Sequence, residues 1–110
     1  MQQISPNELA GWLAASGCHE RAAPVMLDVR EPWEMDICRI DGALAVPMAT
    51  VPPRLQEFDP DADTVVVCHH GVRSFQVALF LERNGFSSVY NLAGGIDAWS
   101  CDVEPSMPKY

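Results

Sequence analysis

The sequence predicts an α/β fold of three layers, in which a mainly parallel β-sheet is covered by helices on both faces. The first observation is a run of β-branched residues at 65–67, which suits a buried strand and is followed by a helical pattern over residues 73–84. The second is that other short apolar runs alternate with helical segments, the order typical of parallel sheets. Hydrophobic residues make up 48% of the chain and charged residues 20%, a balance that argues against disorder.

The N-terminal segment carries the signals of a helix start. Ser5 is the expected N-cap, Pro6 the first helical residue, and Glu8 the partner of Ser5 in a capping box. Gly17 suits the end of this helix. We next expect a strand at residues 24–29, the start of a short helix at residues 31–34 and a second strand at residues 43–46.

The second half of the chain predicts the elements around the longest helix. They are a short helix opened by proline, the buried strand, the long helix, a last strand and the start of a final helix, at residues 51–58, 65–67, 73–84, 88–92 and 96–99. Gly85 suits the end of the long helix, and Gly94 with Gly95 a backbone turn. We therefore expect a single domain over residues 1–110, with a core at about 4–101 and an extended tail at 102–110.

A cysteine lies where the buried strand ends and the long helix begins. Gly71 permits a tight turn between Cys68 and the expected helix start at Arg73 and Ser74. Free backbone N–H groups and the helix dipole make this region electropositive, which favours the nucleophilic thiolate. Arg73 adds a positive charge with a fork of donors suited to an anion, and Ser74 is the helix N-cap, a donor to the sulfur, or both. The stretch predicts a reactive cysteine rather than a structural one.

Several other polar segments follow predicted strands. In open α/β sheets ligands bind beyond the carboxyl ends of the strands, so residues 28–33, 47–48 and 93–94 are expected to meet Cys68 at one mouth. Asp28 and Arg30 are expected to form an ion-paired scaffold under the loop, and Trp33 either lines the mouth or packs ordinarily. The remaining cysteines lie before a strand or after a helix, so we expect no resolving partner for Cys68 among Cys18, Cys38 and Cys101.

Four short motifs occur in order along nearly the whole chain: LDVREPWE, DGA, CHHGVRS and NLAGGIDAW, at residues 27–34, 41–43, 68–74 and 91–99. In this set and order the chain resembles the single-domain rhodaneses, sulfurtransferases that carry sulfur on a cysteine as a persulfide. The resemblance implies the rhodanese-like fold and a sulfurtransferase that needs no metal or organic cofactor. Cys68 would take sulfane sulfur from a donor such as thiosulfate and pass it to cyanide or to a thiol, small or protein-borne.

The same resemblance implies which residues surround the sulfur. Backbone N–H groups of the loop would form a nest around its negative charge. His69 and His70 would shape the entrance and add partial positive charge at about pH 6 to 7. The substrate-binding residues implied are His69, His70, Gly71, Val72, Arg73 and Ser74.

Two alternatives stay open. One is a rhodanese-fold module that carries sulfur or binds a protein without turnover. The other is a cysteine phosphatase or arsenate reductase, disfavoured because only four residues separate Cys68 from Arg73, one fewer than in tyrosine and dual-specificity phosphatases. A Cys–His dyad and a zinc site are disfavoured too, because adjacent side chains rarely face each other and the ligand spacing is wrong.

One segment departs from the family pattern. Relatives typically have Gly-His-Ile-Pro-Gly-Ala where this chain has CRIDGA at residues 38–43. The change affects the local turn, and Cys38 is either a redox sensor or, as we prefer, a tolerated packing change.

Composition limits the partners and the location. The net charge of −8 repels nucleic acid. No apolar run approaches the about 18 residues that span a membrane, and no secretory pattern opens the chain. We therefore expect a cytoplasmic monomer without nucleic-acid or membrane partners.

Overall fold

The computed structural model describes all 110 residues and confirms the α/β prediction. Five strands form one parallel sheet in the order β1-β5-β4-β2-β3. The strands are β1 Gln2–Ile4, β2 Val25–Asp28, β3 Leu44–Ala45, β4 Thr64–Val67 and β5 Val89–Leu92. The helices are α1 Pro6–Gly17, α2 Pro32–Ile37, α3 Val72–Arg83 and α4 Gly95–Asp102. None of the helices has the length and apolar character that crossing a bilayer requires.

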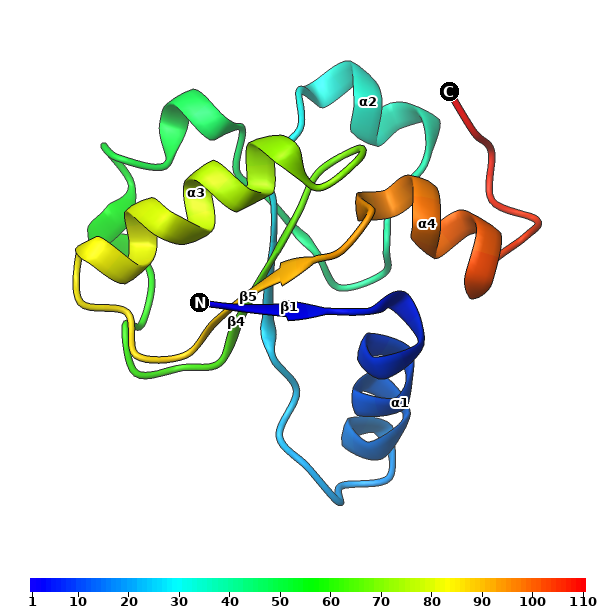
Figure 1. The fold of residues 1–110 in the computed structure, drawn as a ribbon, viewed down its shortest axis with the longest axis horizontal. Helices are drawn as coiled ribbons and strands as arrows, with labels where there is room; N and C mark the ends of the chain where they lie inside the picture. The colour runs from blue at the N-terminus through cyan, green and yellow to red at the C-terminus, as the bar shows by residue number, and fades with distance from the viewer.

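The side chains of β4 alternate between two hydrophobic cores, one on each face of the sheet. Val65 and Val67 belong to a core that includes Trp99 of α4 and several α1 residues, whereas Val66 belongs to a core with Leu81 of α3. Figure 1 shows α3 on one side of the sheet and α1 with α4 on the other. Burial on both faces explains why β4 is a continuous run of apolar and β-branched residues.

The first helix begins as the sequence predicts. The Ser5 hydroxyl accepts from the Glu8 amide at 3.1 Å, and the Glu8 carboxylate accepts from the Ser5 amide at 3.0 Å. The strand that precedes this helix, β1, was not expected from sequence. It pairs with β5, with Gln3 opposite Asn91. Three residues with two exposed side chains carry no local strand pattern, and β1 forms because β5 offers it an unpaired edge.

The short helix expected at residues 51–58 is present only in part. The chain forms one 3₁₀ turn inside this range, at Leu55–Glu57, and another before it, at Met48–Thr50. Pro52 and Pro53 have no N–H to donate, and the amide of Leu55 bonds only three residues back, to the Pro52 carbonyl at 3.3 Å.

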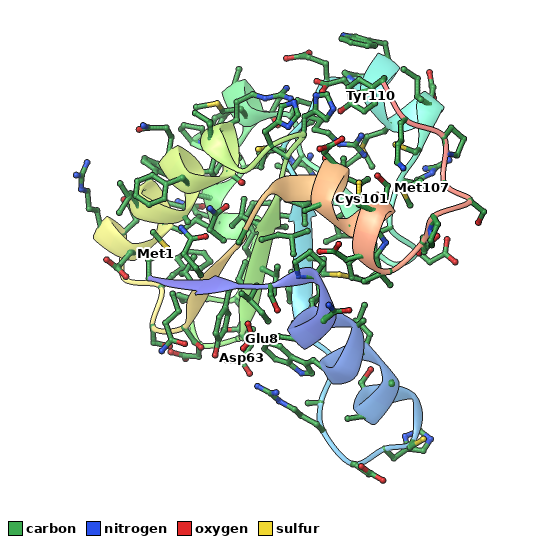
Figure 2. All side chains as sticks on the ribbon, turned by 45° about the vertical axis from the view of Figure 1, so that its right-hand side comes forward. Met1, Glu8, Asp63, Cys101, Met107 and Tyr110 are labelled. Carbon is green, nitrogen blue, oxygen red and sulfur yellow. The ribbon has the colours of Figure 1, made fainter.

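The C-terminal tail, expected to be extended, instead folds back on the domain. Met107 is buried and joins the core that contains Trp99, and its amide bonds to the Glu104 carbonyl at 2.9 Å. Figure 2 shows the tail running from Cys101 past Met107 to Tyr110, which lies beside α2. Burial of an apolar side chain outweighs the preference of Pro105 and Pro108 for an extended chain.

We expect Ser5→Ala to lower the free energy of unfolding by about 1 kcal/mol, because the Glu8 amide loses its capping acceptor. Denaturant unfolding followed by circular dichroism measures the difference. Ser16→Ala is the matched control, since the Ser16 hydroxyl bonds only to the Leu13 carbonyl of the same helix. It should change the stability by less than about 0.5 kcal/mol. Equal losses in the two variants would contradict the capping role.

Candidate active site

Cys68 directly follows β4 at the carboxyl edge of the sheet, and its side chain is enclosed. The residue is 1% exposed. Its sulfur accepts a hydrogen bond from the Gly71 amide at 3.0 Å and lies 3.2 Å from the Ser74 hydroxyl oxygen. Gly71 has φ +96° and is the N-cap of α3, so the turn needs its glycine. The alternative that Ser74 is the N-cap is therefore wrong; Ser74 lies inside the first turn of α3.

The N-terminus of α4 packs directly on the Cys68 loop. The amide of Ile96 donates to the Cys68 carbonyl at 2.8 Å, and the amide of Asp97 donates to the His69 carbonyl at 3.0 Å. A Cβ on Gly95 would lie 2.4 Å from the His69 oxygen and 2.5 Å from the Cys68 oxygen. Gly94 and Gly95 form the expected turn, both with positive φ, and Gly95 also permits this close approach.

A buried asparagine that the sequence analysis missed joins β5 to the loop. Asn91 accepts a hydrogen bond from the Ser74 hydroxyl, and its side-chain nitrogen donates to the Gly71 carbonyl and to Gln3 Oε1, each at 3.1 Å. Asn91 is 2% exposed. A polar residue inside an otherwise buried strand was the signal available in the sequence, because such groups are kept only where they find partners.

Arg73 is engaged by a carboxylate. Its two terminal nitrogens donate to the two oxygens of Glu34 at 2.6 and 2.8 Å. The fork expected to bind a substrate anion is thus occupied, because α2 places Glu34 opposite α3. The hydrogen bonds from Arg73 lower the pKa of Glu34 to about 2, against the opposing effect of burial. The same contact raises the pKa of Arg73 above its ordinary value.

Asp28 and Arg30 form the expected ion pair, with a shortest contact of 2.6 Å and no exposure of either side chain. Arg30 also donates to the Cys38 carbonyl at 2.8 Å and to the Tyr110 hydroxyl at 3.1 Å. Burial disfavours the charge on Arg30, but the bonds to Asp28 and Tyr110 together outweigh it, so the pKa of Arg30 lies above its ordinary value. The pair supports α2 and the tail, and it reaches the loop through Glu34 and through Tyr110, whose ring contacts His69.

Tyr110 connects the tail to the site, and no pattern in the sequence indicated this. Its hydroxyl donates to Glu34 at 2.6 Å, and its ring stacks on His69 with centroids 3.9 Å apart and an interplanar angle of 12°. Trp33, which is 60% exposed, meets the Tyr110 ring edge-on at 5.8 Å. Burial raises the pKa of Tyr110 to about 12, although the bond from Arg30 opposes the shift. Tyr110 therefore remains a donor to Glu34 at neutral pH.

The other loop residues differ in their surroundings. His69 and His70 stack on each other with ring centroids 3.9 Å apart. Burial, followed by the charge of His70, lowers the pKa of His69, so His69 carries less of the expected positive charge than an ordinary histidine. His70 lies 3.9 Å from Asp97, and Val72 is 70% exposed.

Neither the remaining cysteines nor the larger surface groove belongs to the Cys68 loop. Cys18 and Cys101 are exposed, Cys38 is buried with its sulfur 3.9 Å from a nitrogen of Arg30, and all four cysteines are free thiols. A groove of about 310 Å³ between the first 3₁₀ turn and α3 shares no lining residue with the Cys68 loop. The candidate site is therefore an enclosed sulfur within a hydrogen-bonded loop.

Comparison with known proteins places this geometry in a family. The rhodanese-like domain model matches residues 5–102. The chain is 43% identical over 89 residues to the rhodanese-like/PpiC domain-containing protein 12, chloroplastic, of Arabidopsis thaliana, covering 77% of this chain but only 30% of that protein. It is 35% identical over 98 residues to the thiosulfate sulfurtransferase GlpE of Pseudomonas entomophila, covering 89% and 84% of the two chains. A rhodanese-like domain protein from Staphylococcus aureus matches with a TM-score of 0.80 and 34% identity, covering 90% and 91%.

We expect Glu34→Gln to lower the free energy of unfolding by about 2 kcal/mol at neutral pH, because a charge-assisted pair is lost. The pKa of Glu34 is depressed from 4.5 to about 2. Its contribution is therefore fully present above pH 4.5, and the difference from the wild type should shrink as the pH falls through 2. Unfolding in urea across this pH range measures it. The control Glu57→Gln breaks an exposed pair with Arg54 and should cost less than about 0.5 kcal/mol. A difference independent of pH would contradict the assignment.

We expect Gly95→Ala to destabilise the protein by more than about 1 kcal/mol, because the new Cβ collides with the carbonyls of Cys68 and His69 and Gly95 has a positive φ. Gly11→Ala is the matched control. Gly11 lies inside α1 with no atom near its would-be Cβ, so alanine should stabilise the helix by up to about 1 kcal/mol. Thermal unfolding distinguishes the two, and a neutral Gly95→Ala would contradict the close approach of α4 to the loop.

Proposed function

The chain belongs to the rhodanese-like domain family, and from that premise we propose that it is a sulfurtransferase whose nucleophile is Cys68. The observation that carries the proposal is the position of the sulfur at the N-terminus of α3. There it accepts a hydrogen bond from the Gly71 amide at 3.0 Å. Arg73, the second residue of α3, adds a positive charge at the same helix N-terminus. An amide donor, a helix N-terminus and a cation all favour a negatively charged sulfur over a neutral one.

The reaction we propose has two displacements. The Cys68 thiolate attacks the outer sulfur of thiosulfate, the S–S bond of thiosulfate breaks, and its electron pair leaves with sulfite. Cys68 then carries a persulfide whose terminal sulfur is anionic. Cyanide or a thiolate attacks that terminal sulfur, and the electron pair of the second broken S–S bond returns to Cys68 as the thiolate. Thiosulfate is the donor in the name of the Pseudomonas entomophila relative, which supports its choice here.

The loop supports sulfur transfer better than phosphate transfer. Four residues separate Cys68 from Arg73, which leaves a small cradle. Both terminal nitrogens of Arg73 are bonded to Glu34, so a phosphate ester would have to displace a carboxylate to gain them. A persulfide needs only the amide and the nearby charge. The hydrogen bond from the Gly71 amide to the sulfur also favours an enzyme over a module that only binds a protein. Such a module does not need hydrogen-bond donors directed at a cysteine sulfur.

We expect incubation with thiosulfate to add about 32 Da, one sulfur atom on the thiol oxidation ladder, to the intact protein. Cyanide should remove the adduct, because it accepts the terminal sulfur. Cys68→Ser should carry no adduct, whereas Cys101→Ser, which changes an exposed cysteine, should behave as the wild type. Electrospray mass spectrometry of the intact chain measures all three.

Each other outcome points elsewhere. An adduct that persists in Cys68→Ser would move the nucleophile to another cysteine. An adduct that cyanide does not remove would indicate that the protein carries sulfur but does not transfer it to cyanide. Absence of any adduct on the wild type would overturn the proposal, and hydrolysis of an aryl phosphate would then identify the phosphatase alternative.

A further inference from the structure

The hydrogen bonds around Ser74 determine where its single proton lies. The Gly71 carbonyl can only accept, so the side-chain nitrogen of Asn91, 3.1 Å away, must face it. The oxygen of the Asn91 amide therefore faces Ser74. This oxygen can only accept as well, so the Ser74 hydroxyl must donate its proton to Asn91.

The proton on Ser74 in turn determines the state of the cysteine. A hydroxyl has one proton, and the proton of Ser74 is committed to Asn91. The contact of 3.2 Å between Ser74 and Cys68 can then be a hydrogen bond only if the sulfur donates. This arrangement fits a neutral thiol. A thiolate has no proton to donate and would instead need one from Ser74.

We propose that Asn91 is a positioning residue that sets the thiolate population of Cys68 by holding the proton of Ser74 away from the sulfur. On ionisation the thiol proton passes to a base in solution, and the Ser74 hydroxyl turns from Asn91 to the sulfur. The Asn91 oxygen then loses its donor. Asn91, Ser74 and Cys68 are 2%, 0% and 1% exposed, so water does not replace that donor readily. The inference rests on the proposed role of Cys68 as the nucleophile.

The consequence for the reaction is a guarded resting state. Free Cys68 remains protonated to a greater extent than the amide of Gly71 and the charge of Arg73 alone would allow. Oxidation of cysteine follows its thiolate character, so the arrangement protects the nucleophile between turnovers. In the persulfide the Cys68 sulfur carries no proton, so it can no longer donate a hydrogen bond to the Ser74 hydroxyl.

The test compares two Asn91 variants of opposite expected sign. Asn91→Val removes the acceptor, so Ser74 is free to donate to the thiolate, and the pH of half-maximal Cys68 alkylation should fall by about one unit, a tenfold change in thiolate fraction. Asn91→Asp keeps an acceptor for Ser74 and adds negative charge, so the midpoint should rise. Both variants lose the donation to the Gly71 carbonyl, so a purely structural effect would move both midpoints the same way.

The readout is the rate of alkylation of Cys68 by iodoacetamide as a function of pH, quantified on the Cys68 peptide by mass spectrometry. Exposed Cys18 and Cys101 then do not contribute. Comparing midpoints rather than rates removes differences in reagent access. Alkylation needs no sulfur transfer, so a failure here and a failure of the thiosulfate experiment are separate results.

A second background makes the test specific to Ser74. In Ser74→Ala the hydroxyl is gone, and Asn91→Val should no longer move the midpoint. Asn84→Ala, which removes an amide bonded only to the Phe80 carbonyl, should leave the midpoint unchanged. The charged and titratable groups around the loop are the same in these variants: Asp28, Arg30, Glu34, His69, His70, Arg73, Asp97 and Tyr110.

The proposal is overturned if both Asn91 variants move the midpoint in one direction. It is equally overturned if Asn91→Val leaves the midpoint unchanged, or if its shift persists in the Ser74→Ala background. Should Asn91→Val fail to fold, Asn91→Asp and Ser74→Ala still test it. Asn91→Asp should raise the alkylation midpoint of the wild type. The same substitution made in the Ser74→Ala background should raise the midpoint of that background by a smaller amount.

Discussion

The close packing of α4 against the Cys68 loop is the constraint on which the site depends. The amides of Ile96 and Asp97 donate hydrogen bonds to the carbonyls of Cys68 and His69. Gly95, which has no Cβ, leaves room for both oxygens. Because a trans peptide directs its carbonyl and its amide to opposite sides, these bonds turn the N–H groups of His69 and His70 away from α4. A helix N-terminus thus satisfies the carbonyls of Cys68 and His69, and the amide of Gly71, the next residue but one after His69, donates to the sulfur.

A second set of contacts joins parts of the chain that are far apart in sequence. The buried pair of Asp28 and Arg30 meets Tyr110, Tyr110 meets Glu34, and Glu34 holds Arg73. Each charge on this path has a partner, which is the condition for keeping charged groups out of water. For the proposed chemistry, Arg73 contributes a fixed charge at the N-terminus of α3 rather than an open fork for the substrate.

The local rules of the chain predicted much of the fold. A capping box, a glycine at a helix end and apolar runs of the right length depend on neighbouring residues, so α1, α3, β2, β4 and β5 could be placed within one or two residues. The position of Cys68 between a strand and a helix was predicted for the same reason. Two of the failures were segments whose structure depends on distant partners: β1 exists because β5 has a free edge, and the tail folds back because Met107 finds a core.

By itself, the sequence determined the class of the fold, the family motifs and the position of Cys68 in its turn, since these follow from residues adjacent along the chain. Only the tertiary structure decided the surroundings of that cysteine. Glu34 lies 39 residues from Arg73, Asn91 lies 17 from Ser74, and Tyr110 lies 76 from Glu34. No periodicity links such residues, because hydrogen bonds and ion pairs across a sheet are set by how strands and helices pack, not by spacing within them.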